Sequence, residues 1–354
     1  MSRPLGIGAG LLHYGAKVRR PLFIRPQSII HFPSMAAPQH HVEVVAPSRL
    51  HFGMLSFGQV GVRQFGGVGA MIDAPLLKLS LSPAEQLSAD GPQAERALEF
   101  ARRASRFWQL PAEPGCRITV KEAPRSHVGL GSGTQLAMAV AAGLHAFLGR
   151  KRLPLADLAM AVGRGLRSAI GLHGFGLGGL LVESGKLPAE AVSPLVARVD
   201  LPPDWRFVLL CPAVEEGLSG PAEKAAFEQL PPVPPATTDR LAAEVLLHML
   251  PAASVGDFDE FSDSLYRYGL LAGTCFEQRQ GGPFTHPQLV ERLRTRGLRG
   301  VGQSSWGPTV FGLVPDETSA QRVVEELRGE QGHPAFDLHI AAPANHGAQV
   351  QTLA

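Results

Sequence analysis

Cysteine is scarce in this sequence. Its 354 residues include three cysteines, Cys116, Cys211 and Cys275, which lie far apart and form no C-x-x-C pair. A disulfide framework or a cysteine-bound zinc needs closely spaced pairs, so both are excluded. Free cysteines are typical of a reducing compartment, and we therefore expect a cytoplasmic protein.

Long hydrophobic runs are missing as well. The best candidate, Leu136–Leu148, contains Gly143 and His145. It is also shorter than the roughly 18 residues that a membrane-spanning helix needs. We therefore expect a soluble protein with no membrane partner.

A strong charge of either sign is absent from most of the chain. The net charge is +2, but five basic residues and no acidic residue precede position 40, which leaves 28 basic against 31 acidic residues in the remainder. A protein that binds nucleic acid needs a basic surface on its folded part. We therefore expect no nucleic-acid partner.

The residues that are present indicate a globular enzyme. Hydrophobic residues make up 45% and charged residues 18% of the chain, which excludes a disordered protein. The length exceeds what one hydrophobic core usually covers, so two joined domains are expected. Residues 1–40 show no periodicity, and we expect a disordered or miscalled N-terminal extension, with a targeting peptide as the alternative.

Hydrophobic spacing predicts strands and helices in the first half of the chain. Alternating residues indicate strands, and residues three and four apart indicate helices. We expect strands at Val42–Val45, Leu77–Leu81 and Arg117–Lys121, helices at Gln93–Trp108, Thr134–Leu148 and Leu155–Gly165, a glycine-rich turn at Gly171–Gly179, and a strand at Leu180–Glu183. The helix from Thr134 is expected to be amphipathic.

The second half is predicted to be α+β. A short hydrophobic run at Arg206–Cys211 indicates a buried strand, and a proline-rich loop follows it. We expect helices around Arg240–Met249 and Phe258–Leu271, then a strand, a helix and a strand at Thr309–Val314, Thr318–Arg328 and Phe336–Ile340.

The segment His127–Gln135 is the strongest functional signal. It reads HVGLGSGTQ and opens a predicted helix. Glycines let the backbone approach an anion closely, and the N–H groups and dipole of a helix N-terminus favour negative charge. The segment is not a Walker A loop or a dinucleotide motif, because no Gly-Lys-Ser/Thr closes it and no ribose-binding acid follows. It predicts a phosphate cradle, with a plain helix N-cap as the alternative.

Three ordered motifs resemble those of the GHMP kinase superfamily. They are Pro47–Gly53 (PSRLHFG), Pro124–Thr134 (PRSHVGLGSGT) and Gly300–Thr309 (GVGQSSWGPT), and the resemblance extends over about residues 42–340. Within the superfamily the chain most resembles the β-ribofuranosylaminobenzene 5′-phosphate synthases. The further segments behind that choice are Phe65–Gly69, Ile72–Asp73, Gly163–Ser168 and Gly217–Gly220 with Glu223.

The resemblance implies both a fold and a reaction. The fold is α+β and of the GHMP kinase type, with an N-terminal α/β phosphate-binding domain at 41–200 and a C-terminal ferredoxin-like domain at 201–354. The implied reaction condenses phosphoribosyl pyrophosphate with 4-aminobenzoate or 4-hydroxybenzoate and releases CO₂ and pyrophosphate, as in tetrahydromethanopterin biosynthesis. Mg²⁺ is the implied cofactor, and a homodimer remains open as the quaternary state.

One departure from the kinase pattern favours the synthase. Many GHMP kinases carry an acid in a Ser-Gly-Ile-Asp-type run shortly before a glycine pair, and this chain has Ser168–Gly171 (SAIG) before Gly178 and Gly179. Glycine cannot act as a base, and the synthase reaction needs none at that step because CO₂ leaves the attacking ring carbon. Two alternatives stay open, an ATP-dependent kinase of a small alcohol and a non-catalytic nucleotide-binding regulator.

The motifs also supply the candidate site residues. Guanidinium groups bind phosphate and carboxylate bidentately, so we expect catalytic or substrate contacts from arginines and histidines in the motifs. The structural alternatives are a helix-end cation for Arg164 and Arg167, and a packing role for Trp306 in place of stacking on the arene. The candidates are Arg49, His51, His127, Arg164 and Arg167 as catalytic residues, Gly129, Gly131, Ser132, Gly133, Thr134, Gln135, Gln303, Ser304 and Ser305 as substrate and phosphate ligands, and Ser132, Asp73 and Glu223 as Mg²⁺ ligands.

Overall fold

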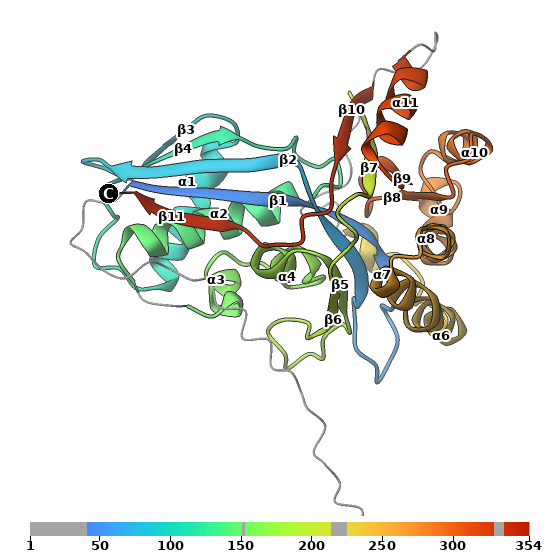
Figure 1. The fold of residues 1–354 in the computed structure, drawn as a ribbon. Coiled ribbons are helices and arrows are strands. Elements are labelled where there is room, and N and C mark those ends of the chain that lie inside the picture. Colours follow the sequence, from blue (N-terminus) through green and yellow to red (C-terminus); the bar gives the residue numbers. More distant parts are fainter. Residues whose placement is uncertain (1–40, 151–152, 214–224, 329–335, 354) are drawn as a thin grey trace, which may run out of the picture.

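Two sheets, each packed against helices, lie side by side in the protein (Figure 1). The computed structural model describes residues 41–150, 153–213, 225–328 and 336–353. The predictions for residues 1–40 and for Glu223 therefore lie outside the described residues. The long strands β1 (His41–Met54) and β2 (Gly67–Pro83) belong to the first sheet and reach the second at one end.

Strands β1 and β2 organise the first sheet. They pair antiparallel, with register shifts at Ala46/Ser48 and His51/Gly53. Such irregularities bend a strand locally and re-aim its side chains. The other strands are β4 (Cys116–Glu122) and β5 (Leu180–Glu183), which both pair with β2, β3 (Ser88–Asp90) beside β4, β6 (Leu195–Val199) beside β5, and β11 (Gln349–Leu353) beside β1. The strands predicted in this half are confirmed.

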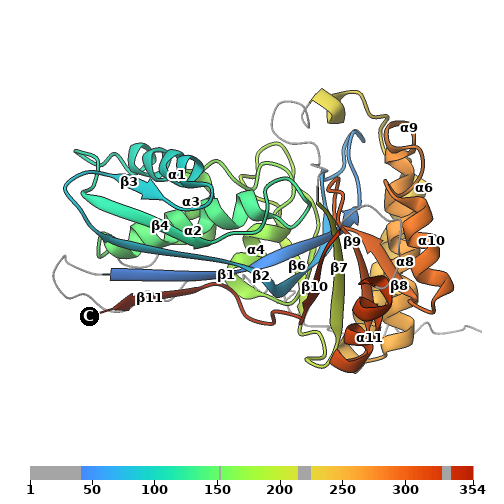
Figure 2. The same cartoon turned by 90° about the horizontal axis from the view of Figure 1, so that it is seen from above.

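Helices cover one face of the first sheet (Figure 2). They are α1 (Ala94–Phe107), α2 (Ser132–Phe147), α3 (Leu155–Ala161) and α4 (Ile170–Leu177). The prediction that α2 is amphipathic is wrong, because every residue from Gln135 to Ala146 is buried. The sheet covers one side of α2 and the other three helices cover the rest, so no polar face is needed.

Helix α4 replaces most of the glycine-rich turn predicted at Gly171–Gly179, and that prediction is wrong. The helix packs so closely on β2 that a Cβ at Gly174 would lie 2.1 Å from the Met71 sulfur. Glycine is therefore used here for close packing rather than for turning. Gly178, with a φ of 66°, ends the helix, and β5 follows where a strand was predicted.

The second sheet has the strand order β10-β7-β9-β8, and all its pairs are antiparallel. Its strands are β7 (Arg206–Pro212), β8 (Gly300–Gln303), β9 (Val310–Val314) and β10 (Phe336–Ala341). Helix α8 (Phe258–Gly273) lies between β7 and β8 in the chain, and α11 (Glu317–Arg328) between β9 and β10. This β-α-β-β-α-β order is the predicted ferredoxin-like arrangement.

Further helices belong to the same half of the chain. They are α6 (Pro235–Ala243), the π-helix η1 (Glu244–Met249), α7 (Leu250–Val255), the short η2 (Thr274–Phe276), α9 (Glu277–Gln280) and α10 (Pro287–Thr295). The boundary predicted at 200/201 falls between β6 and β7, and β11 returns to the first sheet.

A shared hydrophobic cluster joins the two sheets. It includes Leu50 and Phe52 of β1, Phe207 of β7, Phe261 of α8 and Phe311 of β9. The ring centroids of Phe52 and Phe311 lie 5.6 Å apart, so the end of β1 packs directly on the second sheet. Side chains of β1 next to this cluster are therefore held in fixed positions.

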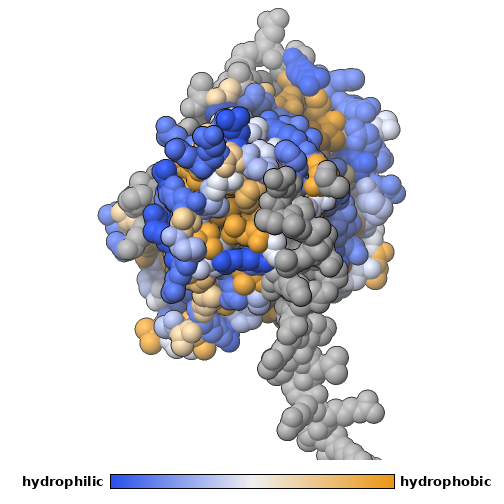
Figure 3. Space-filling view, turned by 90° about the vertical axis from the view of Figure 1, so that its left-hand side faces the viewer, coloured by the Kyte–Doolittle hydropathy of each residue, from blue (hydrophilic) through white to orange (hydrophobic). Residues whose placement is uncertain are grey.

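The surface seen in Figure 3 is mostly hydrophilic, with hydrophobic residues gathered near the centre of the view. Among the described residues, no helix has the length and hydrophobicity needed to cross a bilayer.

Candidate active site

The three sequence motifs meet at the junction of the two sheets. The backbone N–H of His51 donates to Ser304 Oγ over 3.0 Å, and Ser304 Oγ donates to the Gly129 carbonyl over 2.6 Å. The backbone N–H of Arg49 donates to the Leu130 carbonyl over 3.0 Å, and that of Ser305 to the His51 carbonyl over 2.9 Å. The motifs thus form one hydrogen-bonded unit built from β1, the loop before α2 and the β8–β9 turn.

Two glycines allow this close approach. Gly129 has a φ of 90°, and a Cβ there would lie 2.4 Å from the Ser304 carbonyl oxygen. A Cβ at Gly307, in the β8–β9 turn, would lie 2.3 Å from the Gly129 Cα. No real side chain tolerates such distances, so both positions need glycine for the loop and the turn to touch.

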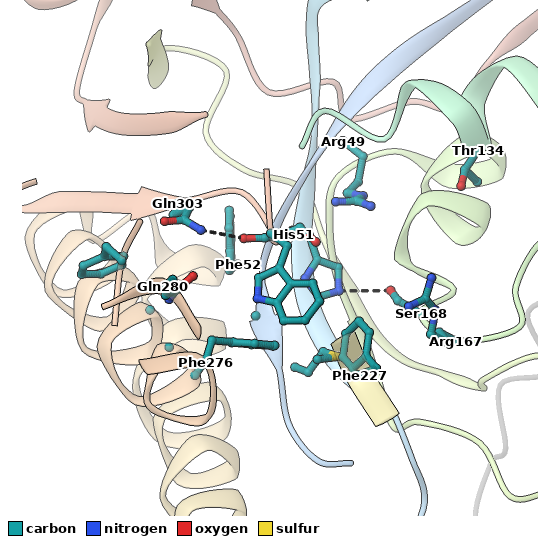
Figure 4. Close-up of a pocket in the computed structure, with 18 of the residues that line it drawn as sticks. Arg49, His51, Phe52, Thr134, Arg167, Ser168, Phe227, Phe276, Gln280 and Gln303 are labelled. Carbon is teal, nitrogen blue, oxygen red and sulfur yellow. Dashed lines mark hydrogen bonds between the residues drawn. The ribbon is translucent and has the colours of Figure 1, made fainter. Parts of the chain in front are cut away.

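A pocket of about 300 Å³ opens beside this unit (Figure 4). Its walls come from β1, the segment between α3 and α4, α8, α9 and the β8–β9 turn. The predicted site residues that line it are Arg49, His51, Thr134, Arg164, Arg167, Gln303 and Ser305.

One wall of the pocket is cationic. Arg49, Arg164 and Arg167 line it. Arg164 and Arg167 follow the end of α3, so neither is a cation in the last turn of that helix. Arg49 and Arg164 lie at the N-terminus of α2, whose first turn has no acidic residue. A Cβ at Gly131 would lie 3.2 Å from Arg49 Nε, and one at Gly133 would lie 3.4 Å from Arg164 Nη2.

Arg96 of α1 belongs to the same cationic cluster, although the motifs did not indicate it. Its Nη2 would lie 2.7 Å from a Cβ at Gly133. Its Nη1 donates to Gln93 Oε1 over 2.7 Å and to Ser126 Oγ over 2.9 Å. Burial lowers its pKa, yet the ordinary value is so high that the guanidinium stays charged. Arg49, Arg96 and Arg164 thus lie together at the N-terminus of α2, an arrangement suited to an anion.

The opposite wall is aromatic. The Trp306 ring centroid lies 4.7 Å from that of Phe227 and 4.9 Å from that of Phe276. Phe52 and Phe284 line the pocket beside them. The Arg167 guanidinium carbon lies 4.9 Å from the Phe227 ring centroid, so a cation bridges the two walls. This wall can bind a flat aromatic ligand by stacking.

His51, Ser168 and Glu183 form a hydrogen-bonded chain at the pocket (Figure 4 shows its first link). His51 Nε2 lies 3.1 Å from Ser168 Oγ, which donates to Glu183 Oε1 over 2.6 Å. Burial, and secondarily Arg49, lower the pKa of His51 to about 3. Burial raises the pKa of Glu183 to about 7 against the opposing hydrogen bonds from Ser168 and Ala169.

Comparison with known proteins identifies the family. The models of the N-terminal and C-terminal domains of the GHMP kinases match residues 94–178 and 249–333. The chain is 30% identical over 308 residues to the β-ribofuranosylphenol 5′-phosphate synthase of Methanothermobacter thermautotrophicus, covering 80% of this chain and 92% of the relative. The chain belongs to the β-ribofuranosylphenol 5′-phosphate synthase family, within the GHMP kinase superfamily.

Other relatives agree with this assignment and with the predicted fold. The synthase of the same name from Archaeoglobus fulgidus is 30% identical over 319 residues, covering 86% of this chain and 98% of the relative. Homoserine kinase from Cytophaga hutchinsonii shares the fold, with a TM-score of 0.63, 16% identity, and coverage of 91% of this chain and 100% of that one. A structure of MDDEF in complex with MVAPP, AMPPCP and magnesium has a TM-score of 0.59 at 12% identity, covering 89% of this chain and 100% of that one.

Other predicted site residues lie behind the pocket wall. Ser132, Gln135 and Ser304 are buried and do not line the pocket. Gln135 Nε2 donates to the Gly171 carbonyl over 2.8 Å and so ties α2 to α4. His127, with a φ of 63°, lies in the turn before α2 and also outside the pocket lining. The ligand roles of these residues remain predictions.

The residues predicted to bind metal do not come together in the described part of this synthase-family chain. Asp73 Oδ1 accepts from the Ala342 backbone N–H over 2.7 Å and does not line the pocket. Glu223 lies outside the described residues. Within the described ranges, no group of three or more His, Cys, Asp or Glu side chains could hold a metal.

Buried histidines predict that the protein loses stability in acid. Burial lowers the pKa of His51 to about 3, that of His145 to about 4, and that of His173 below its ordinary value. Below about pH 6.5 the unfolded chain therefore binds more protons than the folded protein. Each such histidine lowers the free energy of unfolding by about 1.4 kcal/mol for every pH unit below that value. The pKa of Glu183 is raised in the folded protein, so Glu183 stabilises the fold at pH values below its pKa in the unfolded chain. This contribution is lost as the pH rises toward 7. The three buried histidines outweigh the single carboxylate, so calorimetry should record a Tm several degrees lower at pH 5 than at pH 7.

The contribution of a single histidine can be separated from the sum. His145 packs its ring 5.3 Å from that of Trp108, away from the pocket. His145→Gln should reduce the Tm difference between pH 5 and pH 7, because glutamine binds no proton. An unchanged difference would contradict the assignment of the acid sensitivity to buried histidines.

Proposed function

We propose that this protein condenses phosphoribosyl pyrophosphate with 4-hydroxybenzoate, forming a β-ribofuranosylphenol 5′-phosphate and releasing CO₂ and pyrophosphate. The observation that carries the proposal is the pocket's division into a cationic wall and an aromatic wall, in a chain of the synthase family. The phenol in the name of the relatives favours 4-hydroxybenzoate over 4-aminobenzoate.

The cationic wall suits the phosphoribosyl pyrophosphate. Arg49 and Arg164 lie at the N-terminus of α2, and Thr134 is in its first turn, where backbone N–H groups and the helix dipole add to the charge of the arginines. These groups would hold the pyrophosphate as it leaves and stabilise the charge that develops on it. The ribosyl carbon then becomes electrophilic.

The aromatic wall suits the benzoate ring. Stacking against Trp306 and Phe227 would hold the ring carbon that bears the carboxylate next to the ribosyl carbon, which lowers the entropic cost of bond formation. The ring carbon attacks, and the bond to the carboxylate breaks with its electron pair returning to the ring. Arg167, which reaches both walls, would orient the carboxylate before it leaves as CO₂.

Magnesium enters the proposal through the substrate. Among the described residues, no carboxylate lines the pocket, and Mg²⁺ prefers carboxylate and phosphate oxygens. These residues do not form a metal site by themselves. We propose that Mg²⁺ binds to the pyrophosphate of the substrate, with the hydroxyl of Thr134, which lines the pocket, as a candidate contact. The predicted role of Ser132 as a Mg²⁺ ligand stays a prediction, because Ser132 is buried behind the pocket wall. Asp73 and Glu223 remain predictions.

The reaction can be tested by its stoichiometry. With carboxyl-labelled 4-hydroxybenzoate, phosphoribosyl pyrophosphate and Mg²⁺, we expect labelled CO₂ and pyrophosphate in equal amounts without ATP. Scintillation counting of trapped CO₂ and an enzymatic pyrophosphate assay measure the two products. The same assay with 4-aminobenzoate compares the two arenes.

Two other results would overturn the proposal. A ribosylated product that keeps its carboxylate would exclude the decarboxylating reaction. ADP formation with an alcohol substrate and ATP would favour the kinase alternative, although Gly171 lies in the first turn of α4 and supplies no base.

A further inference from the structure

Glu183 has no part in the proposed condensation, yet it lies just behind the pocket. It ends β5 and is completely buried. It accepts from Ser168 Oγ and, over 2.7 Å, from the Ala169 backbone N–H. No ion pair to it is found within the described ranges. A buried carboxylate without a cation is costly, and the hydrogen bonds from Ser168, Ala169, Ser193 and Ile170 offset part of that cost by lowering its pKa.

The hydrogen bonds determine which group donates and which accepts between His51, Ser168 and Glu183. Ser168 has one hydroxyl hydrogen, and donating it to an ionised Glu183 leaves the oxygen lone pairs as acceptors. His51 Nε2, 3.1 Å away, must then carry a hydrogen and donate it to Ser168. Because the pKa of His51 is far below neutral, His51 remains an uncharged donor. Glu183 is the member of the chain that can change its protonation near pH 7.

Ser168 connects this chain to the pocket. It lines the pocket beside Arg167, whereas the Glu183 side chain has no exposed surface. A ligand hydroxyl that reaches Ser168 can therefore exchange a proton with Glu183 only through the serine. The backbone N–H of Ile170 also donates to Ser168 Oγ, but over a long 3.3 Å that an incoming ligand can replace.

We propose that Ser168 and Glu183 form a proton relay for the 4-hydroxyl group of the bound arene, with His51 as a positioning residue. This proposal rests on the proposed function. As the ring carbon bonds to the ribosyl carbon, positive charge develops on the ring and on the 4-oxygen. The 4-hydroxyl gives its proton to Ser168 Oγ while Ser168 gives its own to Glu183 Oε1, so the intermediate becomes a neutral dienone carrying the carboxylate.

The second half of the step returns the proton. When CO₂ leaves, the electron pair of its bond to the ring restores aromaticity, and the 4-oxygen becomes a phenolate. Glu183 then gives its proton back to Ser168, and Ser168 gives its proton to the phenolate. No proton is gained or lost overall, and no oxidant or reductant is needed. The relay lowers the barrier by avoiding a cationic intermediate.

Replacing Glu183 tests the relay. Glu183→Gln keeps the size of the side chain and can still hydrogen-bond, but it cannot accept a proton. We expect kcat to fall about 100-fold, with the KM for phosphoribosyl pyrophosphate within about twofold of the unchanged protein. Ser168→Ala should give a similar loss while leaving Glu183 in place.

The pH profile gives a second readout. In the unchanged protein, kcat should fall as the pH drops through about 7, because Glu183 must be ionised to accept the proton. The Glu183→Gln variant should not show this fall in kcat at low pH. The other titratable groups near Glu183 are His51 on β1, His173 on α4 and Tyr268 on α8, and burial lowers the pKa of both histidines and raises that of the tyrosine. None of these shifts brings a group closer to pH 7.

A more acidic substrate separates the relay from a structural role. The phenol of 3,5-difluoro-4-hydroxybenzoate is already ionised near neutral pH, so no proton has to be removed. The ratio of kcat between the unchanged protein and Glu183→Gln should shrink from about 100 to below about 5 with this substrate. Equal ratios for both substrates would overturn the relay and assign Glu183 a structural role. Absence of activity in the unchanged protein would instead contradict the proposed function.

Discussion

Arg167→Ala should lower kcat/KM about 1,000-fold while leaving Tm within about 2 °C. Arg167 lines the pocket, and its guanidinium contacts the aromatic wall, so it meets both substrates. Removing one partner of a desolvated charge pair typically costs about 2–5 kcal/mol. Its contribution to folding is expected to be small, because the residue is only half-buried and lies between two helices. Steady-state kinetics and calorimetry measure the two quantities.

A matched arginine serves as the control. Arg102 on α1 pairs with Glu113 at the surface, with 45% of its side chain exposed. Arg102→Ala should change neither kcat/KM nor Tm noticeably, since exposed pairs contribute little. If Arg167→Ala loses stability and activity in proportion, Arg167 would be a structural residue. Arg167→Lys should recover part of the loss at most, because an ammonium group cannot bind an anion bidentately.

The sequence predicted most elements of the fold because hydrophobic spacing was clear in them. Strand β7 and helix α11, for example, end within a residue of their predicted limits. Helix α4 was missed because three of its eight residues are glycine, which locally favours turns. Its helical state depends on packing against Met71 and the first turn of α2, and such long-range contacts leave no local pattern.

The candidate site was predicted in part. Arg49, His51, Arg164 and Arg167 were expected from the motifs, and the structure brings all four to one pocket, although their roles remain to be tested. Arg96 and Glu183 were not expected, since each lies in an ordinary helix or strand and reaches the site through tertiary packing. The signal that could have found Glu183 is an acid at the end of a buried strand.

The aromatic wall could not be assembled from the sequence either. Trp306 belongs to a sequence motif and was a candidate for stacking on the arene, but Phe227 and Phe276 lie up to about eighty positions away and are unremarkable aromatics in their own segments. Their ring contacts exist because the β8–β9 turn is fixed on Gly129 and His51 by hydrogen bonds. Trp306 therefore depends on the same three-motif unit that holds the cationic wall.

Trp306→Ala should raise the KM for the arene at least 100-fold. A truncated aromatic anchor in a well-packed site typically costs about 2–4 kcal/mol of binding. The KM for phosphoribosyl pyrophosphate should change less than about threefold, because the arginines and α2 stay in place. Binding of 4-hydroxybenzoate, measured by titration calorimetry in the presence of pyrophosphate, checks the loss apart from turnover.

Two controls decide between stacking and packing for Trp306. Trp306→Phe keeps an aromatic face and should recover most of the affinity for the arene, whereas Trp306→Leu keeps hydrophobic volume without one and should recover less. The residue is half-buried and lies in a turn, so all three variants should unfold within a few degrees of the unchanged protein. Equal affinities for Trp306→Phe and Trp306→Leu would show that the ring fills space. An unchanged arene KM in Trp306→Ala would place the benzoate elsewhere in the pocket, and the division into a cationic and an aromatic wall would then no longer support the proposed reaction.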